Sequence, residues 1–313
     1  MFERIVVPLD GSSYAERVLP YVVALAKGFR SQVSLLHILD LNEYLFAWRL
    51  SSPGNVLLPQ REALAQQLPS KVEAAARVYL EEQAGHLREQ GLAVSVALLY
   101  GDPAEVLVTQ QEIGDEKAGL LAMCTHGRSG LARMFLGSVA DRVLRGGRLP
   151  LLLVHPSDGE TAGEIRQIVV ALDGSAFAEA VLPYAQETAA RLGVPMHVIQ
   201  VLPSLAHIYL GTQIEIYPPD ILEEVQGAAA FYLSNVASRL EKERLHAETH
   251  VLQGNADAAI IRYANERSGS LLALTTHGSS GIGRWMLGSV ADKVVRSSHD
   301  PVLIIRPSQG VGT

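Results

Sequence analysis

The sequence predicts an α/β protein built from two tandem domains. Each domain is expected to be a doubly wound, five-stranded parallel sheet of strand order 3-2-1-4-5, with helices on both faces. Three observations predict this class. The chain repeats itself, apolar β-rich runs alternate with helical segments in each copy, and 313 residues are enough for two domains.

The repeat covers nearly the whole chain. Residues 4–12 return as residues 167–175 at an offset of 163, whereas residues 123–142 return as 274–293 at an offset of 151. The offset falls by 12 (163 − 151), so the first copy is 12 residues longer in its middle. A repeat of this length is a duplicated domain rather than a solenoid unit of roughly 20–50 residues.

The copies set the predicted domain boundaries. The first domain is expected at residues 1–155 and the second at 165–308. Residues 156–164 between them are polar and rich in turn formers, as a short linker should be.

The elements follow in order along the first copy, whose strands are predicted at 5–9, 32–39, 93–99, 119–123 and 151–154. A helix should begin near Ser13, because Ser13 and Glu16 have the spacing of a capping box. A long helix rich in Ala, Glu, Gln and Arg is predicted at 61–90. Shorter helices are predicted at 103–113, which starts with proline, and at 138–145. The second copy repeats the pattern, with strands near 168–172, 196–202, 248–252, 270–275 and 302–305.

Strand order follows from two polar motifs at the carboxyl ends of strands. Asp10-Gly11-Ser12 follows the first strand of the first copy, and residues 126–138 follow the fourth. Alternating strands and helices imply right-handed crossovers and a parallel sheet. Ligands of such sheets bind where the strand order reverses. Both motifs reach one crevice only if the first and fourth strands are neighbours there, which favours the order 3-2-1-4-5.

Composition excludes several classes of protein. A net charge of −7 argues against a nucleic-acid groove or an anionic membrane surface as the main partner. Cys124 is the single cysteine, so no disulfide can form within the chain and a reducing compartment fits. The chain enters a strand at once without a signal sequence, and no apolar run approaches the length of a membrane span. We therefore expect a soluble cytoplasmic protein.

The glycine-rich loops are the candidate ligand-binding elements. Gly127-x2-Gly130-x6-Gly137-Ser138 recurs in the second copy as Gly278-x2-Gly281-x6-Gly288-Ser289. Glycines let the backbone approach a ligand closely, and the N–H groups of a helix that starts at the last Gly-Ser favour phosphate. The alternative is that the glycines only make turns and that Ser138 with Asp141, and Ser289 with Asp292, are capping boxes.

Several other residues and motifs bear on ligand binding, metal binding and catalysis. Asp10 and Asp173 end their first strands, where a carboxylate can accept hydrogen bonds from a sugar or base, ligate Mg²⁺, or only bond its own turn. No zinc-like spacing accompanies His126 or His277, so no metal site is expected. The chain has no Walker P-loop and no G-x-S-x-G elbow. Cys124 ends an apolar strand and is expected to be a buried, inert thiol.

At these residues the chain resembles the universal stress protein family, as a tandem member with two domains covering nearly its whole length. The resemblance rests on the strand followed by Asp-Gly-Ser, on T-H-G-[RS]-S-G leading to L-G-S-V-A-D, and on the closing P-[LV]-L-[LI]-[VI]. It implies a flavodoxin-like fold. It also implies the nucleotide-binding branch, whose members hold ATP with a motif G-x2-G-x9-G-[S/T]. Cys124 and Thr275 stand in place of its first glycine, and a side chain there narrows the space for ribose or phosphate.

The resemblance also implies binding residues for ATP, with ADP or AMP as alternatives and with or without Mg²⁺. The adenosine end would contact Pro8, Asp10, Ile38 and Met123 in the first copy, and Ala171, Asp173, Val201 and Leu274 in the second. The phosphates would meet the loops and helix starts, namely His126, Gly127, Gly130, Gly137, Ser138 and Val139, and His277, Gly278, Gly281, Gly288, Ser289 and Val290.

Three functions follow as hypotheses. The favoured one is a stress-response sensor or regulatory module that binds an adenine nucleotide, because no dedicated catalytic constellation is present and any hydrolysis should be slow. The others are a slow nucleotide hydrolase that holds Mg²⁺ with Asp10 or Asp173, and a ligand-free dimerisation scaffold. Single-domain members of the family commonly pair their fifth strands antiparallel. We therefore expect residues 151–154 and 302–305 to join the two domains as a pseudo-symmetric pair, with a further homodimer as an option.

Overall fold

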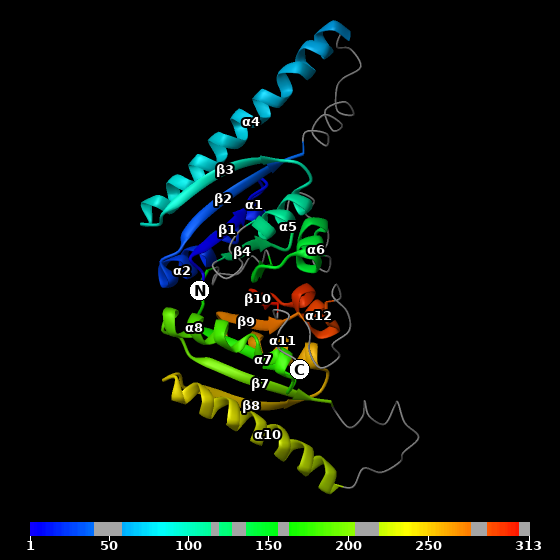
Figure 1. Ribbon diagram of the computed structural model, residues 1–313. Coiled ribbons are helices and arrows are strands. Elements are labelled where there is room, and N and C mark those ends of the chain that lie inside the picture. The colour runs from blue at the N-terminus through cyan, green and yellow to red at the C-terminus, as the bar shows by residue number, and fades with distance from the viewer. Residues whose placement is uncertain are drawn as a thin grey trace.

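Within the described residues, ten strands form one continuous sheet in the order β3-β2-β1-β4-β5-β10-β9-β6-β7-β8 (Figure 1). The structure is a computed structural model that describes residues 1–40, 58–113, 119–126, 136–155, 163–203, 219–276 and 287–306. The first copy supplies β1 (Arg4–Pro8), β2 (Gln32–Leu39), β3 (Val94–Tyr100), β4 (Gly119–Cys124) and β5 (Leu151–Val154). The second supplies β6 (Gln167–Leu172), β7 (Met196–Leu202), β8 (Ala247–Gln253), β9 (Ser270–Thr275) and β10 (Val302–Ile305).

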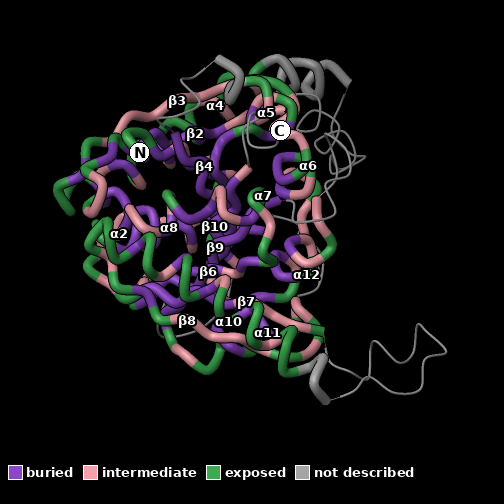
Figure 2. The backbone as a smooth tube through the Cα atoms, turned by 60° about the horizontal axis from the view of Figure 1, so that its bottom comes forward, coloured by how far each residue is buried: buried purple, intermediate pink, exposed green. Residues whose placement is uncertain are grey.

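Each half of the sheet has the predicted strand order. Neighbouring strands within a half are parallel, and both halves read 3-2-1-4-5 when numbered from their own first strand. The predicted fold class, two tandem doubly wound α/β domains, is therefore confirmed. The inner strands of both halves are mostly buried, whereas the edge strands β3 and β8 are mainly of intermediate exposure (Figure 2).

Helices cover both faces of the sheet. In the first copy they are α1 (Ser13–Glu16), α2 (Leu19–Phe29), α4 (Leu58–Glu89), α5 (Pro103–Ile113) and α6 (Ser138–Gly146). In the second they are α7 (Ala176–Glu179), α8 (Leu182–Leu192), α10 (Pro219–Lys242), α11 (Ala256–Asn265) and α12 (Ser289–Ser297). Side chains from α2, α4, α8 and α10 pack into one apolar core, and those from α6, α11 and α12 pack with α5 into the other. Each core runs through both domains.

The start of the first helix differs from the prediction. Ser12, not Ser13, is the N-cap, and its Oγ accepts a hydrogen bond from the N–H of Ala15 at 3.2 Å. This helix ends after one turn, and α2 starts separately with Pro20 in its first turn. The capping box was wrong because Glu16 instead accepts a hydrogen bond from the Tyr79 hydroxyl of α4.

β5 and β10 join the two domains as an antiparallel pair. Leu152 faces Leu303, and these two residues occupy equivalent places in the two copies. The flanking pairs, Leu151 with Ile304 and Leu153 with Val302, are exchanged by the same twofold relation. The register therefore places a pseudo-twofold axis between Leu152 and Leu303. The expected pairing of the fifth strands is present.

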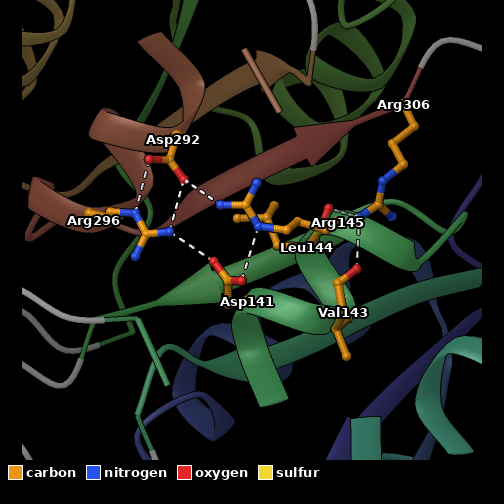
Figure 3. A network of polar contacts seen from close by, with 7 residues as sticks. All are labelled: Asp141, Val143, Leu144, Arg145, Asp292, Arg296 and Arg306. Atoms are coloured by element: carbon orange, nitrogen blue, oxygen red, sulfur yellow. Dashed lines mark hydrogen bonds and ion pairs between the residues drawn. The ribbon is translucent and has the colours of Figure 1, made fainter. Parts of the chain in front are cut away.

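Four charged side chains link the helices beside this axis (Figure 3). Asp141 of α6 accepts hydrogen bonds from Arg145 of its own helix at 3.0 Å and from Arg296 of α12 at 2.8 Å. Asp292 accepts from Arg296 at 3.0 Å and lies 3.6 Å from Arg145. Burial acts to raise the pKa of Asp141, but the two arginines outweigh it and the pKa is lowered. Asp141 therefore stays charged at neutral pH, as does Arg296, whose pKa is raised by its hydrogen bond to Asp292.

The residues after β5 and β10 also reach across the interface. Arg306 donates hydrogen bonds to the carbonyls of Val143, Leu144 and Leu149, at the carboxyl end of α6 and in the turn that follows it (Figure 3). Burial lowers the pKa of Arg306 to about 10, so it remains charged at neutral pH. His155 holds the equivalent place in the first copy and bonds the backbone of Arg296 in α12. Each domain thus caps a helix of the other.

No helix among these described ranges is both long enough and apolar enough to cross a membrane.

The buried carboxyl group of Asp300 should lower the free energy of unfolding. Its Oδ2 is buried without a hydrogen-bond partner, and burial raises the pKa of this carboxyl to about 6. The equivalent residue of the first copy is Leu149. At pH 7 the folded protein bears the cost of a buried charge. We therefore expect Asp300→Asn to raise the free energy of unfolding by roughly 1–2 kcal/mol, after discounting for partial exposure.

The sign of this effect gives the pH test. Between pH 6 and pH 4 the folded carboxyl takes up its proton, so the advantage of Asp300→Asn should shrink as pH falls and vanish near pH 4. Denaturant unfolding of both proteins at pH 7 and pH 4 measures it. If Asp300→Asn raises the free energy of unfolding by the same amount at both pH values, this explanation is contradicted.

Candidate functional site

A cavity of about 300 Å³ opens at the carboxyl ends of the second domain's strands. That volume lies at the lower end of the range for small-molecule sites. Its walls come from β6, β7, β9 and the residues that follow them, and from α7, α11 and α12: Ala171, Leu172, Asp173, Ala178, Val201, Ala256, Ile260, Leu274, Thr275, Thr276, Gly288, Ser289, Val290 and Ala291. Seven of the residues expected to bind nucleotide are brought together here, namely Ala171, Asp173, Val201, Leu274, Gly288, Ser289 and Val290.

The Asp-Gly-Ser turn forms one wall of this cavity. Asp173 Oδ1 accepts hydrogen bonds from the Ser175 backbone at 3.0 Å and from its hydroxyl at 2.6 Å. Gly174 has φ +85°, which only glycine adopts without strain. Asp10 and Ser12 repeat these contacts in the first copy. One carboxylate oxygen therefore holds the turn, as the local-bonding alternative expects.

The start of α12 forms the opposite wall. Its N-cap is Gly288, which has no side chain with which to bond the first-turn N–H groups. In contrast, Ser175 caps α7 with its hydroxyl. The same holds at α6, whose N-cap is Gly137 without a side-chain cap. The capping-box explanation of Ser138 and Ser289 is thus wrong, because both are the first residues inside their helices and Asp141 and Asp292 are held by arginines.

Backbone hydrogen bonds close both glycine loops. Gly288 donates to the carbonyl of Thr276 at 2.6 Å, and Gly137 donates to that of Thr125 at 2.8 Å. A Cβ on Gly137 would lie 3.0 Å from the Thr125 carbonyl oxygen, which is tighter than nine in ten real Cβ contacts, so the neighbouring backbone would have to shift slightly. The glycine therefore favours the close approach of two backbone segments, whether or not a phosphate binds. A valine there would disturb the loop itself and is a poor test of ligand binding.

The first domain has equivalent residues at the matching positions of its own strands. Pro8, Ile38 and Met123 stand where the second domain has Ala171, Val201 and Leu274. Met123 is buried, and Ile38 packs against the same core. Asp10, Gly137, Ser138 and Val139 are partly or fully exposed around the equivalent crevice. The second copy therefore has the smaller side chain at two of these three positions, Ala171 and Val201.

The histidine before the first glycine loop is buried. The Nδ1 of His126 lies 3.0 Å from the Thr125 hydroxyl, and its ring lies 5.4 Å from that of His155 in a tilted arrangement. Burial, with His126 and His299 nearby, lowers the pKa of His155 to about 4. The remaining expected residues lie outside the described part of the chain, namely Gly127, Gly130, His277, Gly278 and Gly281.

The two substitutes for the first motif glycine are both buried. Cys124 packs with Ala15 in the core, and burial raises its thiol pKa to about 12, in accord with an inert thiol. Thr275 lies in the wall of the second cavity, which remains open beside it. The sequence analysis missed Thr276, Ala256 and Ile260. Ala256 and Ile260 come from α11, and their signal was the Gly254-Asn255 turn that starts this helix after β8.

Comparison with known proteins agrees with this architecture. The family model described as "Universal stress protein family" matches residues 1–155 and 164–306. Universal stress protein Slr1230 of Synechocystis is 24% identical and covers 97% of this chain and 100% of its own length. Universal stress protein MJ0531 of Methanocaldococcus jannaschii is 30% identical over 49% of this chain and 82% of its own.

Solved structures show the same fold over the full length. A universal stress protein from Archaeoglobus fulgidus has a TM-score of 0.67 at 21% identity, covering 98% of this chain and 99% of its own. A protein from Pseudomonas aeruginosa described as a putative universal stress protein has a TM-score of 0.64 at 19% identity, covering 98% and 94%. With the family model matching both copies, the chain belongs to the universal stress protein family.

Proposed function

We propose that the protein binds an adenine nucleotide, ATP first among them, in the crevice of its second domain, and acts through this ligand as a regulatory module in the stress response. The observation that carries the proposal is the cavity of about 300 Å³ at the carboxyl ends of β6, β7 and β9. Cytoplasmic location belongs to the same proposal.

The walls of the cavity suit the two ends of a nucleotide. Ala171, Val201 and Leu274 offer an apolar surface for a base. The start of α12 offers first-turn N–H groups and the positive end of the helix dipole for phosphates. Asp173 is exposed at the rim and is placed to meet a ribose or a cation. The smaller side chains of the second copy favour its crevice over that of the first.

The decisive variant is Ser289→Asp. A carboxylate at the first position of α12 agrees with the helix dipole, so the fold should be unaffected. The same charge lies where the phosphates would bind and should weaken ATP binding at least about tenfold, since about 1.4 kcal/mol of repulsion is enough. Isothermal titration calorimetry of the full chain with ATP measures this effect.

The duplication supplies a matched control. Ser138→Asp makes the same change at the start of α6 and should leave ATP binding unaltered. Loss in Ser138→Asp alone would assign the site to the first domain. If ATP, ADP and AMP give no heat and no competition at millimolar concentration, the proposal fails and the ligand-free scaffold is favoured. Steady phosphate release that disappears in Asp173→Ala or Asp10→Ala would favour the hydrolase.

A further inference from the structure

A cluster of metal-ligating side chains lies at the other end of the second domain's strands. His197 is the second residue of β7, and Glu248 and His250 lie on one face of β8 because they are two residues apart. His197 is the register partner of Glu248. Val201, in the wall of the crevice, is four residues further along β7, or about 13 Å away. The cluster is therefore separate from the proposed nucleotide site.

The distances suit a tetrahedral ion. Glu248 Oε2 lies 3.4 Å from His197 Nδ1 and 3.6 Å from His250 Nε2. With metal–ligand bonds of about 2.0–2.2 Å, the edges of a tetrahedron are about 3.3–3.6 Å long. One ligand atom from each of the three residues lies within 4.8 Å of the other two, so closing the third edge needs a shift of the order of 1 Å.

The hydrogen bonding of the cluster leaves a nitrogen for the ion. His250 Nε2 is buried and makes no hydrogen bond. His197 is buried, and its Nδ1 lies 3.2 Å from the Tyr263 hydroxyl of α11, which an ion would replace as partner. Among the described residues, Arg267 is a cation close to the cluster, and its guanidinium lies over the Tyr263 ring and 3.7 Å from Glu266.

The first domain shows that the fold does not require these residues. At the same register β2 and β3 carry Ser34 opposite Ser95, with a 3.0 Å contact between their hydroxyls. Ala97 takes the place of His250. In the first domain, two hydroxyls and a methyl group therefore fill the places that the cluster occupies in the second domain. Two imidazoles and a carboxylate there are a property of the second domain alone.

We propose that His197, Glu248 and His250 bind a divalent transition-metal ion of the zinc type, with a fourth position open to water. Two nitrogen ligands argue against Mg²⁺ and Ca²⁺, which prefer oxygen. Three protein ligands with an open position are the pattern of exchangeable rather than closed structural zinc sites.

The test is titration of the chelator-treated full chain with Zn²⁺ at pH 7.5, by calorimetry without nucleotide. We expect one ion per chain, and a loss of affinity of at least about tenfold in His197→Ala and in His250→Ala. His246→Ala is the matched control, because His246 also pairs with a glutamate, Glu241 at 3.6 Å, but is exposed. Equal loss in the control, or binding that persists in the double variant His197→Ala with His250→Ala, would overturn the proposal.

A second measurement keeps the test decisive if a variant fails to fold. Co²⁺ added to the wild-type chain should give the visible absorption bands of a tetrahedral site, and added Zn²⁺ should remove them. Absence of these bands would also overturn the proposal. Because α11 carries Tyr263 of the cluster as well as Ala256 and Ile260 of the crevice, the titration is repeated with ATP present. Zn²⁺ binding without ATP would stand even if nucleotide binding failed.

Discussion

Replacing Leu152 with lysine should prevent the two domains from folding together. Leu152 has no exposed surface and lies on the pseudo-twofold axis opposite Leu303. An ammonium group there would be buried without a partner. We expect a loss of more than about 4 kcal/mol, a large part of the 5–15 kcal/mol that stabilises a typical domain. Ile304→Lys, on the other face of the same pair, should behave alike.

Circular dichroism and size-exclusion chromatography measure this effect as loss of the cooperative transition or as aggregation. Val78→Lys on α4 is the control, because that side chain is 69% exposed and should change stability by less than about 0.5 kcal/mol. A soluble Leu152→Lys protein that melts like the wild type would show that β5 and β10 do not pair in solution.

Replacing Arg306 with alanine should be the second most damaging of these changes. The three carbonyls that Arg306 bonds lie at the domain interface, and the variant would leave them without this donor. The Val143 carbonyl would still accept from the Gly147 N–H at 2.8 Å, so not every carbonyl loses its last donor. Each buried acceptor that is left unsatisfied costs about 1–3 kcal/mol. We therefore expect a loss of roughly 2–3 kcal/mol and a fall in melting temperature of the order of 5 °C.

Two further variants distinguish the effect of the three hydrogen bonds of Arg306 from the effect of its positive charge. Arg306→Lys keeps the charge but cannot reach three carbonyls at once, so it should recover only part of the stability. Arg88→Ala removes an exposed arginine that bonds Glu81 and the Val94 carbonyl, and it should have a small effect. If Arg306→Ala melts within 2 °C of the wild type, a threshold of about 1 kcal/mol, the cap contributes little.

Strand order could be predicted because it depends on short-range patterns and on one geometric condition. Asp10 and the glycine loop had to reach the same crevice, and that placed β1 beside β4. The pairing of β5 with β10 was expected from two apolar sheet edges together with the resemblance to a family whose single-domain members pair these strands. Helix starts were less predictable, because serines and glycines in a row offer several candidate caps. Ser12 and Gly137 are the N-caps because each has an extended backbone just before its helix begins. The spacing of polar residues does not reveal this conformation.

Side-chain contacts that depend on strand register could not be predicted. Arg306 meets α6 only because the antiparallel register brings the end of β10 beside that helix. The cluster of His197, Glu248 and His250 joins residues about fifty positions apart through a strand register. In both cases the sequence shows a polar residue in or after a strand, and its partner is set by three-dimensional placement.

The pairing of β5 with β10 in one chain has a consequence for how the copies can change. In a homodimer of identical subunits every interface residue occurs twice, so any substitution acts on both sides of the axis. Here each edge is encoded separately, and the pairing takes place at the effective concentration set by the linker rather than at that of the protein. One copy can therefore use His155 where the other uses Arg306, and the assembly does not come apart on dilution.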